Sequence, residues 1–317
     1  MKPSDNANEI PHVSVLYQQI ISALRPVSPG YYVDATVGAG GHAWGILDRS
    51  SPDGKLVGLD VDPQALKIAS QRLSLFKDRV HLLHSSYIEL RTALLTLGWD
   101  HVNGIVIDLG VSSMQIDSSE RGFSFTHDGP LDMRFDPSQP VSAEDIVNHS
   151  AEADLADIIW RYGEDRNSRR IARAIVQNRP FHSTMELADQ IKKLAGPRPH
   201  QIHPATRTFQ ALRIAVNQEL DSLERFLPQA VNALAAGGRL AVISFHSLED
   251  RIVKQYFRQE SRDCICPPGQ PVCTCGHTAS VIEITRHPIV ADELEIAANY
   301  RARSAKLRVI EKKQANE

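Results

Sequence analysis

Short runs of β-branched and other apolar residues alternate with helical segments over the first 110 residues of the chain. The runs cover residues 31–36, 56–60, 80–84 and 104–108. Parallel strands need crossover connections as long as a helix, so this alternation favours a parallel sheet with helices on both faces. The sequence therefore predicts an α/β fold.

The clearest helical segment covers residues 64–76. Its apolar residues Leu66, Ala69, Leu73 and Phe76 recur at intervals of three and four. That spacing places all four on one face of a helix, and we predict a helix over the whole segment.

The alternation stops after residue 110. Residues 111–140 are rich in Ser, Gly, Asp and Pro, and the segments after them have helical spacing alone: 154–162, 167–178, 184–195 and 205–227. Strand-like runs return at 239–244, 280–285 and 305–311. We therefore expect a seven-stranded, mostly parallel sheet whose last two strands pair antiparallel, interrupted by an inserted helical domain. The expected parts are 1–115 (sheet domain, first part), 116–215 (helical insertion) and 216–317 (sheet domain, second part).

The composition is close to that of an ordinary globular protein, with 42% hydrophobic and 23% charged residues. It excludes a disordered chain, a collagen-like chain and a long coiled coil. No uninterrupted apolar run reaches the length of a membrane span, and the first nine residues are mostly polar. We expect a cytoplasmic protein that does not cross a membrane.

A glycine-rich turn follows the first predicted strand. Residues 38–43, GAGGHA, fit G-x-G-x-x-G/A, and Asp60 ends the next strand twenty residues beyond Gly40. Glycine lets backbone N–H groups approach a ligand, and a carboxylate at this spacing can hold both hydroxyls of an adenosine ribose. The pattern fits NAD or S-adenosylmethionine, and a tight turn without a ligand is the alternative. Asp34, four residues before Gly38, can face a cationic amino-acid group and favours S-adenosylmethionine.

Several longer segments make a more specific match. They are DATVGAGGH at 34–42, DLGVSSMQIDSSERGFSF at 108–125, PLDMRF at 130–135, TFQALRIAVNQEL at 208–220, SFHSLEDRIVK at 244–254 and RARSAKLRV at 301–309. In order and over nearly the whole chain, they resemble the MraW (RsmH) family of cytosine-N4 methyltransferases of small-subunit ribosomal RNA. The resemblance implies a class I, Rossmann-like methyltransferase fold.

The resemblance also implies the activity and the site. S-adenosylmethionine would be the cofactor, and the substrate would be the exocyclic N4 amine of one cytidine in the decoding region of 16S ribosomal RNA. The implied cofactor contacts are Gly40, Gly41, His42, Asp60, Tyr87, Asp108 and Gln115. Asp60 would hold the ribose, Tyr87 would lie near the adenine, and Asp108 with Gln115 would border the methionine end and the target base.

Asp108 is the candidate catalytic residue. The lone pair of cytosine N4 is delocalised into the ring, and a carboxylate that accepts a hydrogen bond from the amine would help it attack the methyl group. Direct displacement of this kind requires alignment of the reacting atoms and no metal. Related amino-methyltransferases have a proline-aromatic turn here, whereas this chain has Gly110-Val111-Ser112. Asp108 therefore either assists the amine or serves the cofactor alone.

The predicted helix at 167–178 carries basic residues off its apolar face. Ile171, Ala172 and Ile175 share one face, and Arg169, Arg170 and Arg173 point partly elsewhere. We expect the insertion to hold the RNA through such arginines. The alternative is a solvated surface on which they pair with Glu164 and Asp165.

All four cysteines lie in one short segment, in the pattern C-x-C-x6-C-x-C. They are Cys264, Cys266, Cys273 and Cys275. Four thiolates at this spacing can close a structural zinc site, although C-x-C is a less usual half-site than C-x2-C. Reduced thiols in a loop are the alternative, and a reducing compartment fits both.

Two other functions compete with methyl transfer. A nicotinamide-dependent oxidoreductase would fit the glycine turn and Asp60, but it leaves the insertion and the other segments unexplained. A non-catalytic RNA-binding factor could retain the same fold. The expected partner is small-subunit ribosomal RNA, within an assembled or late-assembling subunit, and a homodimer is an open alternative.

Overall fold

The computed structural model describes residues 14–195 and 203–314. The polar start of the chain, residues 1–9, lies outside this range. The chain divides into two compact units, one formed by residues 1–109 with 226–317 and the other by residues 110–225. We call the first the sheet unit and the second the insertion unit. Their boundaries fall near, but not at, the positions 115/116 and 215/216 expected from the sequence.

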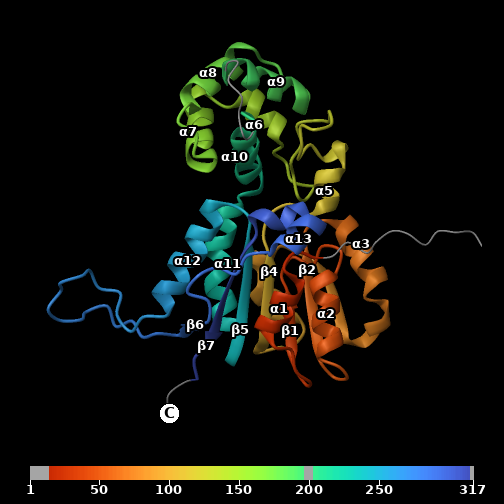
Figure 1. Ribbon diagram of the computed structural model, residues 1–317, viewed down its shortest axis with the longest axis vertical. Helices are drawn as coiled ribbons and strands as arrows, with labels where there is room; N and C mark the ends of the chain where they lie inside the picture. Colours follow the sequence, from red (N-terminus) through yellow and green to blue (C-terminus); the bar gives the residue numbers. More distant parts are fainter. Residues whose placement is uncertain (1–13, 196–202, 315–317) are drawn as a thin grey trace, which may run out of the picture. The chain divides into compact units, whose positions relative to one another are not determined.

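A seven-stranded sheet forms the centre of the sheet unit, in the order β3-β2-β1-β4-β5-β7-β6 (Figure 1). Strands β1 to β5 pair in parallel, and β7 pairs antiparallel with both β5 and β6. The strands are β1 Tyr31–Asp34, β2 Lys55–Asp60, β3 Val80–His84, β4 Val102–Asp108, β5 Leu234–Ser244, β6 Val281–Glu283 and β7 Lys306–Lys312. The mostly parallel α/β fold and the antiparallel final pair predicted from the sequence are confirmed.

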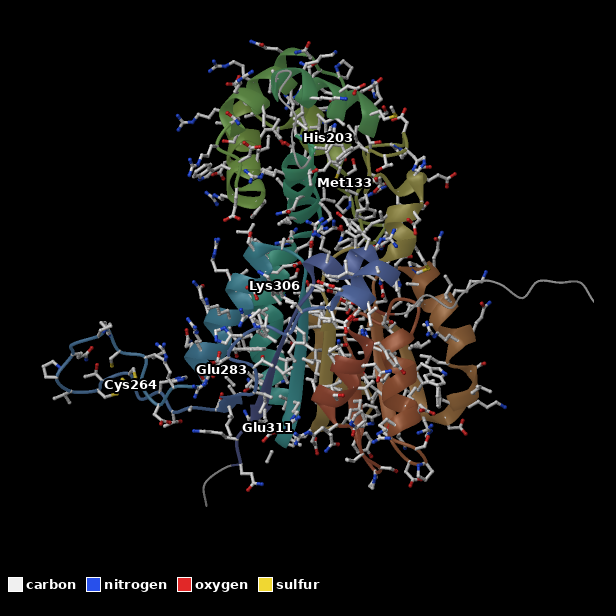
Figure 2. The ribbon with its side chains drawn as sticks, viewed as in Figure 1. Met133, His203, Cys264, Glu283, Lys306 and Glu311 are labelled. Atoms are coloured by element: carbon white, nitrogen blue, oxygen red, sulfur yellow. The ribbon has the colours of Figure 1, made fainter. Side chains whose placement is uncertain are left out.

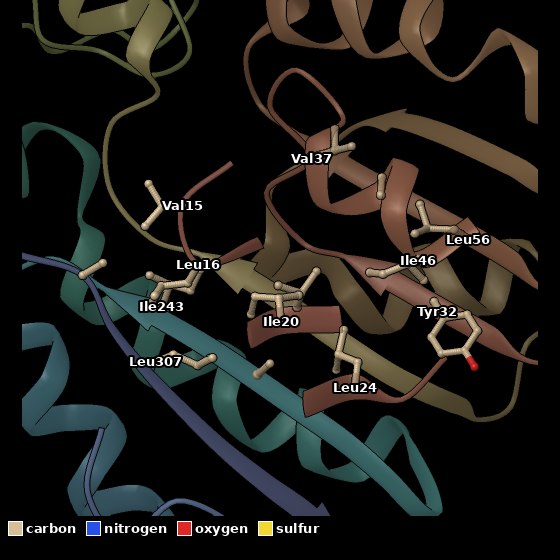
Figure 3. Packing of buried hydrophobic residues seen from close by; sticks show 14 of the residues in the cluster. Val15, Leu16, Ile20, Leu24, Tyr32, Val37, Ile46, Leu56, Ile243 and Leu307 are labelled. Atoms are coloured by element: carbon tan, nitrogen blue, oxygen red, sulfur yellow. The ribbon is translucent and has the colours of Figure 1, made fainter. Parts of the chain in front are cut away.

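Apolar residues cover both faces of this sheet. Val106 of β4 and Ile243 of β5 belong to a core cluster that also contains residues of helices α1 (Tyr17–Leu24) and α2 (Gly41–Arg49) (Figure 3). Their strand neighbours Ile107 and Val242 are equally buried. Successive side chains on a strand point to opposite faces, so the sheet is buried on both sides, as a parallel sheet requires.

The remaining helices of the sheet unit flank the strands. They are α3 Pro63–Arg72, α4 Leu90–Thr96, α12 Ser247–Glu260 and α13 Glu293–Ala298, and α11 (Glu219–Ala233) crosses the boundary between the units. The predicted helix at 64–76 was too long. It ends at Arg72, and a 3-10 helix, Ser74–Arg79, leads into β3. The predicted apolar face is correct, because Ala69 and Leu73 are fully buried.

The insertion unit is helical and has a core of its own. Its helices α5 to α10 are Ser113–Asp117, Ala143–His149, Glu152–Gly163, Ser168–Gln177, Thr184–Ala195 and Thr206–Asn217. Leu155, Ile159, Ile171 and Ile175 are among the buried residues of this core. The predicted helix at 205–227 is two helices, α10 and α11, separated by Gln218 in the left-handed conformation (φ 49°).

Among the described residues, no helix combines the length and apolar character needed to cross a membrane.

Candidate active site

Three neighbouring strands of the sheet unit, β2, β1 and β4, each end in an aspartate. These residues are Asp60, Asp34 and Asp108. Open α/β sheets bind ligands outside the carboxyl ends of their strands, where connections leave the sheet in different directions. The three carboxyl groups therefore mark the candidate site within this unit.

Asp60 is bonded to the glycine turn. Its Oδ2 accepts a hydrogen bond of 2.8 Å from the Gly38 N–H, and its Oδ1 accepts one of 2.9 Å from the Asp62 N–H. An ionised carboxylate has about four acceptor positions, so Asp60 can still accept hydrogen bonds from a ligand. Asp60 thus lies where the sequence pattern expects a ribose partner.

The turn itself needs glycine for two different reasons. Gly40 adopts φ 79°, a left-handed conformation that L side chains rarely adopt, and a Cβ there would also press on Leu73. A Cβ on Gly41 would overlap with Oγ of Ser14. Glycine is therefore required at both positions by the backbone conformation of the turn and its close packing against neighbouring residues.

Burial changes the protonation of the central carboxyl groups. Asp34 is 1% exposed, and burial followed by the Asp60 charge raises its pKa to about 7, although a hydrogen bond from the Thr36 N–H acts in the opposite direction. The pKa of Asp108 lies well above its usual range because of burial first, then the charges of Asp34 and Glu249. Burial also raises the pKa of Asp60.

One oxygen on each of two carboxyl groups is buried without a hydrogen-bond partner among the described residues. These atoms are Oδ2 of Asp34 and Oδ1 of Asp108. Buried polar atoms are nearly always satisfied, and an unpaired oxygen costs free energy. Acidic groups with spare acceptors fit a ligand that brings positive charge and hydrogen-bond donors.

The side chain of His42 is bonded to another part of the protein. Its side chain is 4% exposed, and its Nε2 lies 2.9 Å from the carbonyl oxygen of Val15. Burial lowers the pKa of His42 to about 4, so the ring is neutral at physiological pH. The imidazole is therefore occupied in joining the start of α2 to the segment before α1, and only the backbone of His42 belongs to the glycine turn.

Tyr87 and Gln115 each make contacts with other residues of the protein. Tyr87 follows β3 and is half-buried, with its ring edge-on to Phe226 at a centroid distance of 5.3 Å. Gln115 is 6% exposed and belongs to the insertion unit. Its Oε1 accepts from the Ser112 N–H, and its own N–H donates to Ser112 Oγ, which makes a capping box at the start of α5.

Two residues that act on Asp108 were missed in the sequence. Thr36 Oγ1 accepts a hydrogen bond of 2.7 Å from the Asp108 N–H and joins β1 to β4. Glu249 is 2% exposed, lies in the first turn of α12 and adds to the raised pKa of Asp108. Glu249 forms a capping box with His246, but His is not one of the residues that mark an N-cap in a sequence.

The sheet order, the antiparallel β7, the glycine turn and the acidic strand ends together define a class I methyltransferase fold. Residues 9–313 match the family model of the MraW methylase family, and the chain belongs to this family. The protein is accordingly a methyltransferase whose cofactor is S-adenosylmethionine. Membership excludes the nicotinamide-dependent alternative.

Relatives with curated names agree with this assignment. The chain is 52% identical to the "Ribosomal RNA small subunit methyltransferase H" of Dehalococcoides mccartyi (strain ATCC BAA-2266 / KCTC 15142 / 195), over 96% of this chain and 87% of the relative. It is also 52% identical to the protein of that name from Geobacter sp. (strain M21), over 95% of this chain and 98% of the relative.

Similar solved structures include an rRNA methylase from Streptococcus thermophilus, at 12% identity and a TM-score of 0.43 over 94% of each chain. Another is a methyltransferase from Streptococcus mutans in complex with SAH, at 11% identity and a TM-score of 0.42 over 93% of this chain and 94% of that one. Both likenesses are distant, and the family assignment rests on the sequence match.

Proposed function

We propose that this protein transfers the methyl group of S-adenosylmethionine to the N4 amine of one cytidine in the decoding region of small-subunit ribosomal RNA. The shared name of the curated relatives supports small-subunit ribosomal RNA as the substrate. The observation that carries the choice of an amine is the unpaired, buried Oδ1 of Asp108 at the end of β4.

The proposed cofactor contacts follow the sequence expectation with one change. Asp60 would accept from the ribose hydroxyls, and the backbone of Gly40, Gly41 and His42 would face the cofactor while the His42 ring stays bonded to Val15. Asp34 would face the cationic amino-acid group, since its Oδ2 is a buried acceptor without a partner among the described residues. Tyr87 would lie near the adenine, and Gln115 would border the methionine end and the target base.

Bound S-adenosylmethionine supplies a methyl group on a positively charged sulfur, which a nucleophile can displace directly. The task of the protein is to hold the cytosine N4 in line with that methyl group. Asp108 would accept a hydrogen bond from the amine, which favours a pyramidal nitrogen with an available lone pair.

Asp108 would also receive the proton that the nitrogen loses when its bond to the methyl group forms. A carboxylate with a raised pKa is a stronger base than an ordinary one and retains a proton better. Positive charge on the bound cofactor would keep Asp108 ionised before the reaction. Its backbone N–H is held by Thr36, which fixes the position of the residue at the end of β4.

The insertion unit would bind the RNA. Helix α8 buries Ile171, Ala172 and Ile175, as the sequence predicted, and leaves Arg169 exposed. Phosphate contacts from such arginines give sequence-independent affinity and position the substrate.

Mass spectrometry of small-subunit RNA tests the proposal. Cells that lack the protein should lose one N4-methyl group from a decoding-region cytidine, and purified protein with S-adenosylmethionine should restore it. Restoration by the Asp48→Asn control, a change at an exposed residue of α2, should match the unmodified protein. An unaltered methylation pattern in the deleted cells would exclude this substrate and favour the non-catalytic alternative.

The same proposal covers the assembly state of the substrate and the oligomeric state of the enzyme. We expect cytoplasmic small subunits, assembled or late in assembly, to be methylated faster than naked RNA. Sedimentation of the active preparation distinguishes a monomer from the homodimer.

A further inference from the structure

Residues 261–280, between helix α12 and strand β6, form a long loop. No residue in it is buried, and it contains no helix or strand. In Figures 1 and 2 it projects from the sheet unit, with Cys264 in the projecting part. Loops of this length without secondary structure are uncommon in compact domains, and burial of apolar surface does not explain the order of this one.

The base of the loop is closed by polar contacts. The Ser280 N–H donates to the carbonyl oxygen of Glu260 at 2.9 Å, and Ser280 Oγ donates to the Glu260 carboxylate at the same distance. The Ala279 N–H donates to Asp263 Oδ1 at 3.2 Å. These contacts bring the two ends of the loop together but lie outside the cysteine segment.

All four cysteines of the chain meet within this loop. They are free thiols, and their Sγ atoms all lie within 4.8 Å of one another. The Sγ distances are 4.0 Å for Cys266–Cys273, 3.5 Å for Cys273–Cys275 and 3.9 Å for Cys275–Cys264. A tetrahedron with metal–sulfur bonds of about 2.3 Å has edges of about 3.8 Å, so these three distances are close to the edges of a tetrahedral site, and the other three do not exceed 4.8 Å.

The local sequence explains how the sulfur atoms converge. Residues two apart in an extended segment point to the same side, so each C-x-C pair presents two sulfur atoms together. Between the pairs, Pro267, Pro268 and Gly269 reverse the chain, with Gly269 at φ 89°. The Cys266 N–H donates to Cys264 Sγ at 3.4 Å, the kind of backbone contact that supports a thiolate ligand.

We propose that Cys264, Cys266, Cys273 and Cys275 bind one zinc ion, which fixes the loop between α12 and β6. Four thiolate ligands at tetrahedral spacing select zinc among common ions with no redox role, and they leave no open position for catalysis. A single ion fits better than an iron–sulfur cluster, because several irons between the thiolates would hold the sulfur atoms farther apart. The site is structural and separate from the strand ends that bind the cofactor.

Elemental analysis of the full-length protein, purified without chelators, tests the assignment. We expect about one zinc per chain in the unmodified protein and almost none in the double variant Cys264→Ser, Cys275→Ser. The matched control Val272→Ser changes an exposed loop residue that offers no ligand and should retain the zinc. The double variant should bind S-adenosylmethionine with unchanged affinity while its melting temperature falls.

A second measurement keeps the test decisive if the double variant does not fold. Chelation of the unmodified protein should release the zinc and expose four reactive thiols, and added Co2+ should then give the visible absorption of tetrahedral thiolate coordination. The proposal would be overturned if the protein contained no metal, or iron in place of zinc. It would also be overturned by disulfides in place of thiols, or by zinc retained in the folded double variant.

Discussion

Two carboxyl groups of the insertion unit have arginine partners, whereas two carboxyl groups at the strand ends of the sheet unit each keep an oxygen that is unpaired within the described part of the chain. In the insertion unit, Glu219 is 6% exposed and accepts two hydrogen bonds from Arg213, at 2.8 and 3.0 Å. Asp132 is similarly paired with Arg134, which outweighs the effect of burial and lowers the pKa of Asp132. In the sheet unit, Asp34 and Asp108 each keep a buried oxygen without a hydrogen-bond partner among the described residues.

This difference separates carboxyl groups with a structural role from carboxyl groups that belong to a functional site. A carboxylate that is paired with an arginine of its own unit has its hydrogen-bonding capacity met within the fold. A buried carboxyl group with spare acceptors and a raised pKa is typical of a functional site, where a ligand supplies the missing partner.

Asp108→Asn should lower the methylation rate about 100-fold, because it removes the carboxylate that accepts from the target amine and receives its proton. The affinity for S-adenosylmethionine should change much less. Single-turnover methylation and calorimetric titration measure the two quantities, with Asp48→Asn as the exposed control. Equal losses of rate and cofactor affinity would assign Asp108 to the cofactor alone.

Asp60→Ala should weaken S-adenosylmethionine binding by about 1.5–3 kcal/mol, the range for hydrogen bonds to a charged group. That corresponds to roughly 10- to 150-fold in Kd. The fold should persist, because the variant loses two hydrogen bonds from backbone N–H groups but no apolar packing. Asp78→Ala, at an exposed residue, is the control, and unchanged calorimetric affinity in Asp60→Ala would remove Asp60 from the site.

Cofactor affinity should rise with pH up to about 7, by at most about tenfold per pH unit, because a cationic ligand prefers the ionised form of Asp34. The free energy of unfolding of the ligand-free protein should have the opposite pH dependence. Between about pH 4 and 7 the folded chain retains the Asp34 proton that the unfolded chain has released, so the free energy of unfolding falls as pH rises. Asp34→Asn should flatten both profiles, and profiles identical to those of the unmodified protein would contradict the role of Asp34.

Arg169→Glu should weaken RNA binding a few-fold and lower the salt slope of single-strand binding by roughly 0.7 for each phosphate that the arginine neutralises. We choose Arg169 because its neighbours have other contacts, with Arg170 donating to the Leu194 carbonyl oxygen and Arg173 paired with Glu152. Filter binding at several salt concentrations gives the slope. As a control, charge reversal of the exposed Arg49 in the sheet unit should have less effect. An unaltered slope in Arg169→Glu would mean that this surface of the insertion unit contacts solvent and not RNA.

The sequence predicted the sheet well because its signals are local. Each strand is a short apolar run, and Asp60 and Asp108 could be placed at strand ends from their position in those runs. Asp34 was expected inside a strand over 31–36 and instead ends β1. The break between α10 and α11 could not be predicted. Asn217 uses its side chain to bond Met133 and Phe135, residues distant in the sequence, and Gln218 then turns left-handed.

Side-chain direction was the other limit for the candidate site. The resemblance implied His42 as a cofactor contact. The ring is buried against Val15, a contact that no periodicity encodes. Gln115 lies in a predicted polar loop and is instead buried in a capping box with Ser112. Tertiary packing decided the orientation of the His42 ring, whereas the Ser112–Gln115 capping box is a local pattern that the sequence contains. The backbone of the glycine turn followed from its residue types alone.

We expect the sheet unit to bind S-adenosylmethionine and the insertion unit to bind RNA. Both affinities can be measured on the same two variants, Asp60→Ala and Arg169→Glu. Asp60→Ala should lose cofactor affinity with RNA affinity unchanged, and Arg169→Glu should lose RNA affinity with cofactor affinity unchanged. A variant that loses both affinities by similar factors while remaining folded would contradict this expectation.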